Sequence, residues 1–222
     1  MAKIQIECPV KKRIADKIER AEFVGREWSK LYPDATCSLD YGRDPFRLLC
    51  QARLSAQCTD ARVNIVSKDL FARFPDAESM ANADLNELEK LVYPCGVYKV
   101  KAKNLRDMSR ILVDRFGGRV PESREDLLSL PGIGMKIANL IRGDLFGDPM
   151  IVPDTHLIRI SGRLGLTDST VPERVENDMS ALIRKADRSD FCHRAVNFGR
   201  EYCKAQGARC DSCPLNLNSE KI

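Results

Sequence analysis

Hydrophobic and polar residues alternate along this chain with the period of amphipathic α-helices. From residue 10 to residue 32 the apolar positions recur every three or four residues until Pro33 interrupts them, so one helix is expected there. Asp44 followed by Pro45 marks another helix start, because aspartate caps a helix and proline fits its first turn. Further helical periodicity covers residues 63–74, 84–92, 101–116, 172–186 and 189–203. The period-two pattern of strands is absent, and we predict an all-α protein with about nine or ten helices.

A short sequence with two glycines, LPGIGMKIANL at residues 130–140, is the most distinctive local pattern. One short helix is expected to end at Pro131, and a second is expected to begin at Met135. Gly132 and Gly134 lie between them and lack a Cβ, so the backbone here can take positive φ and approach another molecule closely. The N–H groups at the start of the second helix suit a phosphate oxygen. Such a helix-hairpin-helix binds a nucleic-acid backbone without reading its bases.

Several segments together resemble the helix-hairpin-helix DNA glycosylase superfamily, and specifically the endonuclease III family. The resemblance rests on LPGIGMKIANLI and VPDTHLIRI, while DPFRLLCQARLSAQCTD, CGVYKVKAKNL and the terminal cysteines follow in the family's order. It implies the helix-hairpin-helix DNA glycosylase fold, in which two helical domains have the DNA cleft between them. Residues 38–148 would form a six-helix barrel ending in the hairpin, and residues 1–37 and 149–222 would pair as the second domain.

The resemblance places the catalytic chemistry on Lys136 and Asp154. An amine can displace a base from C1′ of deoxyribose as a Schiff base, and loss of the C2′ proton then releases the 3′ phosphate by β-elimination. The amine must be neutral to attack, which partial burial of Lys136 and the positive end of its helix would both favour. Besides capping its own helix, Asp154 would stabilise the positive charge that develops on the sugar. The expected function is repair of damaged, oxidised pyrimidines in double-stranded DNA.

Contacts with DNA are expected from several parts of the chain. Gln57 matches the family residue that enters the duplex and fills the gap left by an extruded nucleotide, which offsets part of the cost of flipping a base. Val97 stands where the family often has a larger aliphatic wedge. Residues 97–120 carry seven Lys or Arg and two acidic residues, and we predict that they follow the phosphates. The individual residues predicted to bind DNA are Gln57, Gly132, Ile133, Gly134, Lys204 and Arg209.

Composition and charge limit the number of domains and the class of partner that can be expected. A chain of 222 residues that is 43% hydrophobic can form one large domain or two small ones. The formal charge of +4 permits a polyanionic partner without requiring one. Neither a signal peptide nor a run of membrane-helix length is recognised in the sequence. We expect a cytoplasmic monomer that associates with the nucleoid through its binding to DNA.

The cysteines suggest a metal site, because nine thiols in a reduced protein are more easily explained by ligation than by disulfides. Cys203, Cys210 and Cys213 follow the spacing C-x6-C-x2-C near the end of the chain. In the resembled family a fourth cysteine follows, and the four hold a four-iron, four-sulfur (4Fe-4S) cluster. Ser219 occupies that position here, so the candidates for the fourth ligand are water, the Ser219 oxygen and Cys8. Zinc and an empty site are the alternatives to the cluster.

Three other functions agree with part of the pattern. A monofunctional glycosylase of the same superfamily would stop at the abasic site and show no nicking that depends on Lys136. A non-catalytic helix-hairpin-helix protein would bind DNA and turn nothing over. A small metal or redox protein would bind no DNA, and the lysine on the hairpin would then have no explanation.

Overall fold

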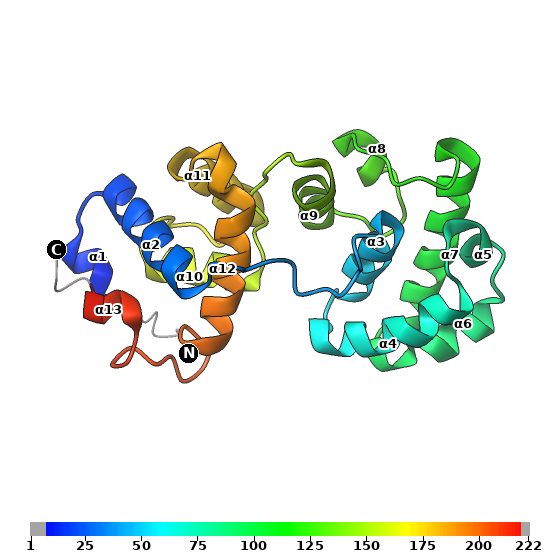
Figure 1. Ribbon diagram of the computed structural model, residues 1–222, viewed down its shortest axis with the longest axis horizontal. Coiled ribbons are helices and arrows are strands. Elements are labelled where there is room, and N and C mark those ends of the chain that lie inside the picture. The colour runs from blue at the N-terminus through cyan, green and yellow to red at the C-terminus, as the bar shows by residue number, and fades with distance from the viewer. Residues whose placement is uncertain (1–7, 219–222) are drawn as a thin grey trace. The chain divides into compact units, whose positions relative to one another are not determined.

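The computed structural model describes residues 8–218, which form α-helices joined by short loops (Figure 1). No strand occurs within this range, so the prediction of an all-α protein is confirmed. Residues Cys37–Asp148 form one compact unit, and the segments up to Thr36 and from Pro149 form another. We call them the hairpin unit and the terminal unit. No helix in the described part of the chain is long and apolar enough to cross a membrane.

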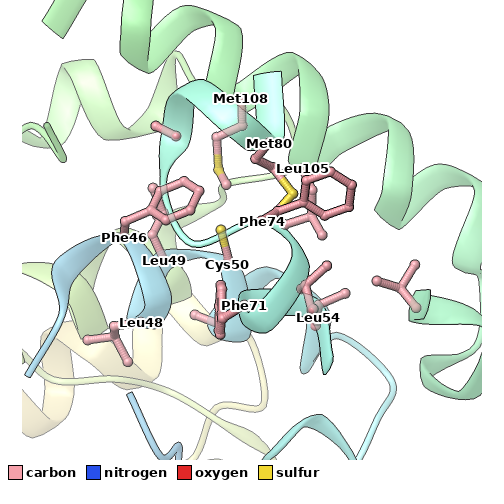
Figure 2. Close-up of a cluster of buried hydrophobic side chains, with 14 of the residues drawn as sticks. Phe46, Leu48, Leu49, Cys50, Leu54, Phe71, Phe74, Met80, Leu105 and Met108 are labelled. Atoms are coloured by element: carbon pink, nitrogen blue, oxygen red, sulfur yellow. The ribbon is translucent and has the colours of Figure 1, made fainter. Parts of the chain in front are cut away.

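The hairpin unit is built around one hydrophobic core. Phe46, Leu49 and Cys50 point into this core together with Phe71 and Met108, and buried leucines surround them (Figure 2). Each fully buried Leu or Phe side chain contributes about 1.5–3 kcal/mol relative to an exposed one, so this cluster is the main source of the unit's stability. Its helices are α3 (Pro45–Leu54), α4 (Asp60–Arg73), α5 (Ala77–Ala81), α6 (Leu85–Val92), α7 (Tyr98–Phe116), α8 (Arg124–Leu128) and α9 (Met135–Phe146). A 3-10 turn, η1 (Tyr93–Cys95), precedes α7.

The terminal unit brings the two ends of the chain together around a second core. Trp28 is fully buried there, and its ring lies 4.7 Å from that of Phe191 and 5.3 Å from that of Phe198, centroid to centroid. These contacts join an N-terminal helix to a C-terminal one. The helices are α1 (Pro9–Arg13), α2 (Lys17–Leu31), α10 (Thr155–Arg163), α11 (Pro172–Leu182), α12 (Arg188–Glu201) and α13 (Pro214–Asn218), with a 3-10 turn, η2 (Lys185–Asp187), before α12.

The single helix predicted over residues 10–32 is wrong, because the chain leaves the helical conformation between α1 and α2. Ile14 is extended, with φ −114° and ψ 98°. The Asp16 side chain then accepts hydrogen bonds from the backbone N–H groups of Ile18 and Glu19, both at 2.8 Å. An aspartate that bonds to the backbone in this way favours a new helix start over a continuous helix.

Candidate functional site

The hairpin predicted from the two glycines is formed by α8, α9 and the loop between them. Gly132 has φ +78°, which favours glycine, whereas Gly134 is extended with φ −108° and ψ 179°. The sequence allowed positive φ at both glycines, but only Gly132 adopts it. A Cβ added to Gly132 would also collide with Asn104 and lie 2.8 Å from Cδ of Arg53. Ile133 is buried, and its backbone N–H donates to the carbonyl of Leu130 at 3.1 Å.

Two polar contacts support the hairpin: one lies beneath its loop, and the other joins its own two helices. With its amide oriented to satisfy both neighbours, Asn104 accepts hydrogen bonds from Nε and Nη2 of Arg53 at 3.0 Å each. These side chains come from α7 and α3 and lie directly against Gly132. On the other side Arg124 of α8 donates to the buried Asn139 of α9 at 3.2 Å. Both contacts join residues far apart in the sequence, so no local pattern could have predicted them.

The N-terminus of α9 lacks a side-chain cap. Helices α2 to α6, α8 and α10 each begin after an Asp, Ser or Thr whose side chain accepts a hydrogen bond from the first turn. At α9 that position is Gly134, which has no side chain to accept one. The N–H groups of this turn are therefore open to an anion from outside the chain, and the helix dipole adds to the attraction.

Lys136 lies at the second position of α9 and is exposed. The helix turns Ala138, Asn139 and Ile141 into the protein, which leaves the lysine on the solvent side. The partial burial predicted for Lys136 is therefore wrong for the chain without a partner. The amine stands in the same turn as the uncapped N–H groups, so an anion bound there would lie beside it.

Gln57 and Val97 both stand in strained backbone at exposed turns of the hairpin unit. Their φ angles are +56° and +47°, a region that non-glycine residues rarely occupy and that is especially unfavourable for a β-branched valine. The neighbouring thiols Cys58 and Cys95 are close enough to affect one another electrostatically, so the two turns lie side by side. Burial raises the pKa of Cys95 to about 11, and Cys58 adds to that effect. Backbone strain of this kind concentrates at binding sites, where the surrounding structure holds a side chain outwards.

The basic stretch at residues 97–120 is only partly available to phosphates. Lys101 is 1% exposed, and its Nζ donates to the Cys95 carbonyl at 2.7 Å. It therefore supports the turn that carries Val97, and burial lowers the pKa of Lys101. Arg110 donates to the carbonyl of Ala81 at 3.0 Å. The prediction that this stretch follows the phosphates as a whole is thus wrong for Lys101, whose amine cannot reach an external anion.

Asp154 belongs to the terminal unit and caps α10. Its Oδ1 accepts a hydrogen bond from the backbone N–H of Leu157 at 2.7 Å. The side chain is half-buried, and Oδ2 has no hydrogen-bond partner among the residues that the structure describes. The carboxylate is thus fixed through one oxygen while the other is open to a ligand.

Four thiols line one cavity of the terminal unit: Cys8, Cys203, Cys210 and Cys213. Burial raises the pKa of Cys8 to about 12, and the three nearby thiols add to the effect. Arg163 of α10 lies over this group, with Nη1 3.3 Å from the Cys203 sulfur.

The four thiols of this cavity are a donor set that an iron-sulfur cluster can use. Within residues 8–218 no three His, Cys, Asp or Glu side chains converge as ligands of one metal ion. A tetrahedral zinc site would hold its sulfurs only about 3.8 Å apart, given a Zn–S distance of roughly 2.3 Å. A cubane cluster binds each thiolate to a different iron, so its ligands surround a wider space. Ser219 lies outside the described residues.

The loop that carries Cys203 and Cys210 also carries the two predicted basic DNA contacts. Arg209 is exposed, and its backbone N–H donates to the carbonyl of Tyr202 at 2.9 Å. Lys204 is half-buried, and its carbonyl accepts from Arg163 at 2.7 Å. The structure therefore places both side chains on one short loop held by α10.

This chain is similar in sequence and in structure to known helix-hairpin-helix proteins. The family model described as HhH-GPD superfamily base excision DNA repair protein matches residues 50–185. Endonuclease III of Synechocystis sp. is 43% identical over 205 residues, which cover 92% of this chain and 93% of that protein. A non-covalent endonuclease III–DNA complex matches with a TM-score of 0.86 at 39% identity, covering 92% of this chain and 97% of that one. A trapped endonuclease III–DNA covalent intermediate, an estranged-adenine complex, matches with a TM-score of 0.85 and the same identity and coverage.

Proposed function

Since this chain belongs to the endonuclease III family of base excision DNA repair proteins, we propose that it removes damaged, oxidised pyrimidines from double-stranded DNA and cuts the strand at the abasic site. The observation that carries the proposal is the exposed Lys136 in the first turn of a helix that begins at an uncapped glycine. The relatives solved with DNA, one of them as a covalent intermediate, support it.

The hairpin binds the DNA backbone. A phosphate oxygen accepts hydrogen bonds from the first turn of α9, while the left-handed Gly132 lets the loop approach the strand. Gln57 enters the duplex in place of the extruded nucleotide, and the exposed Val97 beside it acts as a small wedge. Arg209 and Lys204 add phosphate contacts from the terminal unit, which makes binding dependent on salt.

Lys136 supplies the nucleophile. Its neutral amine attacks C1′ of the deoxyribose, a C–N bond forms as the bond from C1′ to the base breaks, and the base leaves with a proton. The C1′–O4′ bond of the sugar ring then opens, O4′ takes the second proton of the amine, and the Schiff base forms. The Schiff base acidifies the C2′ proton, whose loss expels the 3′ phosphate and nicks the strand. Hydrolysis then returns the free lysine. Because Lys136 is exposed in the free chain, the bound DNA must remove water from the amine before it attacks.

Asp154 stabilises the sugar as positive charge develops at C1′. The hydrogen bond from Leu157 fixes one carboxylate oxygen, so the other is held in place before the reaction begins. A preorganised charge of this kind stabilises a transition state more than a freely solvated one.

The cysteine cavity of the terminal unit would hold a 4Fe-4S cluster, with Cys203, Cys210 and Cys213 as three of its ligands. When bound, the cluster supplies a covalent cross-link between segments and takes no part in the bond cleavage. The residues around it do the positioning: Arg163 holds the carbonyl of Lys204 and lies beside Cys203, which sets the loop that carries Arg209.

A gel assay tests the proposed activity directly. Duplexes with one thymine glycol, one uracil or one abasic site are incubated with the protein, and the products are separated under denaturing conditions. We expect nicking at thymine glycol and at the abasic site without added alkali. Nicking of thymine glycol only after alkali would identify a monofunctional glycosylase, and binding without any product would identify a non-catalytic DNA-binding protein.

Two glycine substitutions in the hairpin are expected to differ in their effect on stability. Gly132→Ala forces a residue with a Cβ into φ +78° and against Arg53, so the free energy of unfolding should fall by about 1–3 kcal/mol. Gly134→Asp fits its extended backbone with open space around it, and its carboxylate should cap α9 at no cost in stability. Thermal unfolding measures both changes.

The same Gly134→Asp variant should weaken binding to damaged and undamaged duplexes equally. The new carboxylate of this variant would accept the hydrogen bonds that a phosphate otherwise accepts, and its negative charge would repel the phosphate. One such charge-assisted hydrogen bond contributes about 1.5–3 kcal/mol, so its loss lowers the affinity roughly tenfold or more. Fluorescence anisotropy with matched duplexes measures the loss. Weakened binding to only one lesion would mean that Gly134 lines the base pocket instead.

A further inference from the structure

The C-terminal cysteines are one ligand short of the family's pattern. Cys203, Cys210 and Cys213 are present, and Ser219 takes the place of the fourth. Iron-sulfur clusters favour soft thiolate ligands, and a serine hydroxyl is a hard donor that is hard to deprotonate. A chain that keeps the cluster therefore has reason to take its fourth thiolate from another segment.

Cys8 is the further thiol that the fold brings to the cavity of the C-terminal cysteines. It lines the same cavity as Cys203, Cys210 and Cys213, although it comes from the opposite end of the chain. Its sulfur lies 3.8 Å from Oδ1 of Asn216, and Nδ2 of the same asparagine donates to the carbonyl of Cys210 at 2.7 Å. A single asparagine thus connects Cys8 to the cysteine loop.

The backbone around Cys8 is fixed independently of any metal. The N–H of Cys8 donates to the carbonyl of Arg163 at 3.0 Å, and Pro9 starts α1 directly after it. One turn later Arg13 donates to the carbonyl of Asn216 at 2.6 Å. Cys8 occupies the N-cap position of α1, and its thiol lies beside Asn216, the residue that also bonds to the cysteine loop.

The surroundings also suit a group of thiolates. Arg163 contacts the sulfur of Cys203, and Arg209 lines the same cavity. Two guanidinium groups at this cavity reduce the cost of placing several negatively charged sulfurs together in a partly buried site.

We infer that Cys8 is the fourth ligand of the cluster, so that one site joins the N-terminal segment to the C-terminal loop. The inference rests on the proposed cluster and adds a ligand that the C-terminal spacing does not contain. It has a structural consequence: the cluster would tie α1 to the loop of Arg209 directly.

The test compares purified full-length variants prepared without oxygen, by iron and sulfide content and by electron paramagnetic resonance. The wild type and Ser219→Ala should each contain about four irons per chain. Cys8→Ala should contain about three or fewer, with the paramagnetic signal of an oxidised three-iron cluster or no cluster at all. Cys192→Ala is the matched control, because this buried thiol of the same unit bonds to the backbone of Val152 instead, and its iron content should not change.

A rescue variant separates ligation from folding. Adding Ser219→Cys to Cys8→Ala should restore about four irons, because it supplies a thiolate at the position where the family has one. A full four-iron cluster in Cys8→Ala that is lost in Ser219→Ala would overturn the inference while leaving the cluster in place. A wild-type protein with one zinc, or with no metal, would overturn both the cluster and this ligand.

Discussion

Lys136→Ala is expected to abolish both covalent trapping on DNA and strand nicking while DNA binding persists. Borohydride should trap the wild-type protein on a thymine glycol or abasic duplex by reducing the Schiff base, and the alanine variant has no amine to form one. Loss of a nucleophile commonly lowers a rate by about a thousandfold or more. Single-turnover assays and denaturing gels measure both properties. Since Lys136 is exposed and its side chain makes no packing contact that the core needs, the melting temperature should be unchanged.

A matched lysine controls for the loss of one positive charge. Lys68 is also an exposed helical lysine of the hairpin unit, on α4 and away from the hairpin. Lys68→Ala should keep wild-type trapping and nicking. If Lys136→Ala is still trapped to the wild-type extent, another amine is the nucleophile and the assignment is wrong.

The helices and the hairpin could be predicted from the sequence because their signals are local. Asp44 before Pro45, and the two glycines before Met135, each contain within a few residues the chemistry that starts a helix. The five-residue helices α5 and α13 were missed, since so few residues show no clear period, and α1 was merged with α2 into one predicted helix. The break near Ile14 was missed because the apolar spacing continues through it, while the deciding signal was Asp16 as a cap.

The prediction that residues 97–120 follow the phosphates rested on the number of basic residues. The apolar periodicity of α7 was a better guide to which of them are exposed. Lys101 lies in register with Leu105, Met108 and Leu112, which are four, seven and eleven residues on and form the buried face of α7. The periodicity therefore placed this lysine inside the protein, where it bonds to the carbonyl of Cys95. A basic residue on a buried stripe indicates a structural role more strongly than its charge indicates a phosphate contact.

The cysteine cavity is formed by segments that are far apart in the sequence. The same is true of the Arg53–Asn104 contact beside Gly132. Nothing near Cys8 in the sequence indicates that it meets Cys203, since the fold of the terminal unit brings the two ends together. In the same way Arg53 and Asn104 reach Gly132 from two other helices. Only the tertiary structure, or a resemblance that already contains it, reveals such groups.

Asp154→Asn is expected to lower the rate of base removal by about 10²–10³ while leaving the fold intact. Asparagine keeps an oxygen that can accept the hydrogen bond from Leu157, and it is as good a helix cap as aspartate. It carries no charge, so the stabilisation of the developing positive charge on the sugar is lost, at a cost of about 2.7–4 kcal/mol. Single-turnover kinetics on a thymine glycol duplex measure the rate, and thermal unfolding measures the fold.

Two further variants separate the role of Asp154 in the reaction from its role as a cap. Asp154→Ala should show the same loss of rate and, in addition, a loss of about 0.5–2 kcal/mol in stability, because the N–H of Leu157 loses its acceptor. Asp84 caps α6 in the same manner, through a 3.0 Å hydrogen bond from Glu87, and Asp84→Asn should keep full activity. Full activity in Asp154→Asn would reduce the role of this carboxylate to capping, because the charge would then be shown to contribute nothing to the cleavage. An equal loss in Asp84→Asn would trace the effect to helix stability instead of to charge on the sugar.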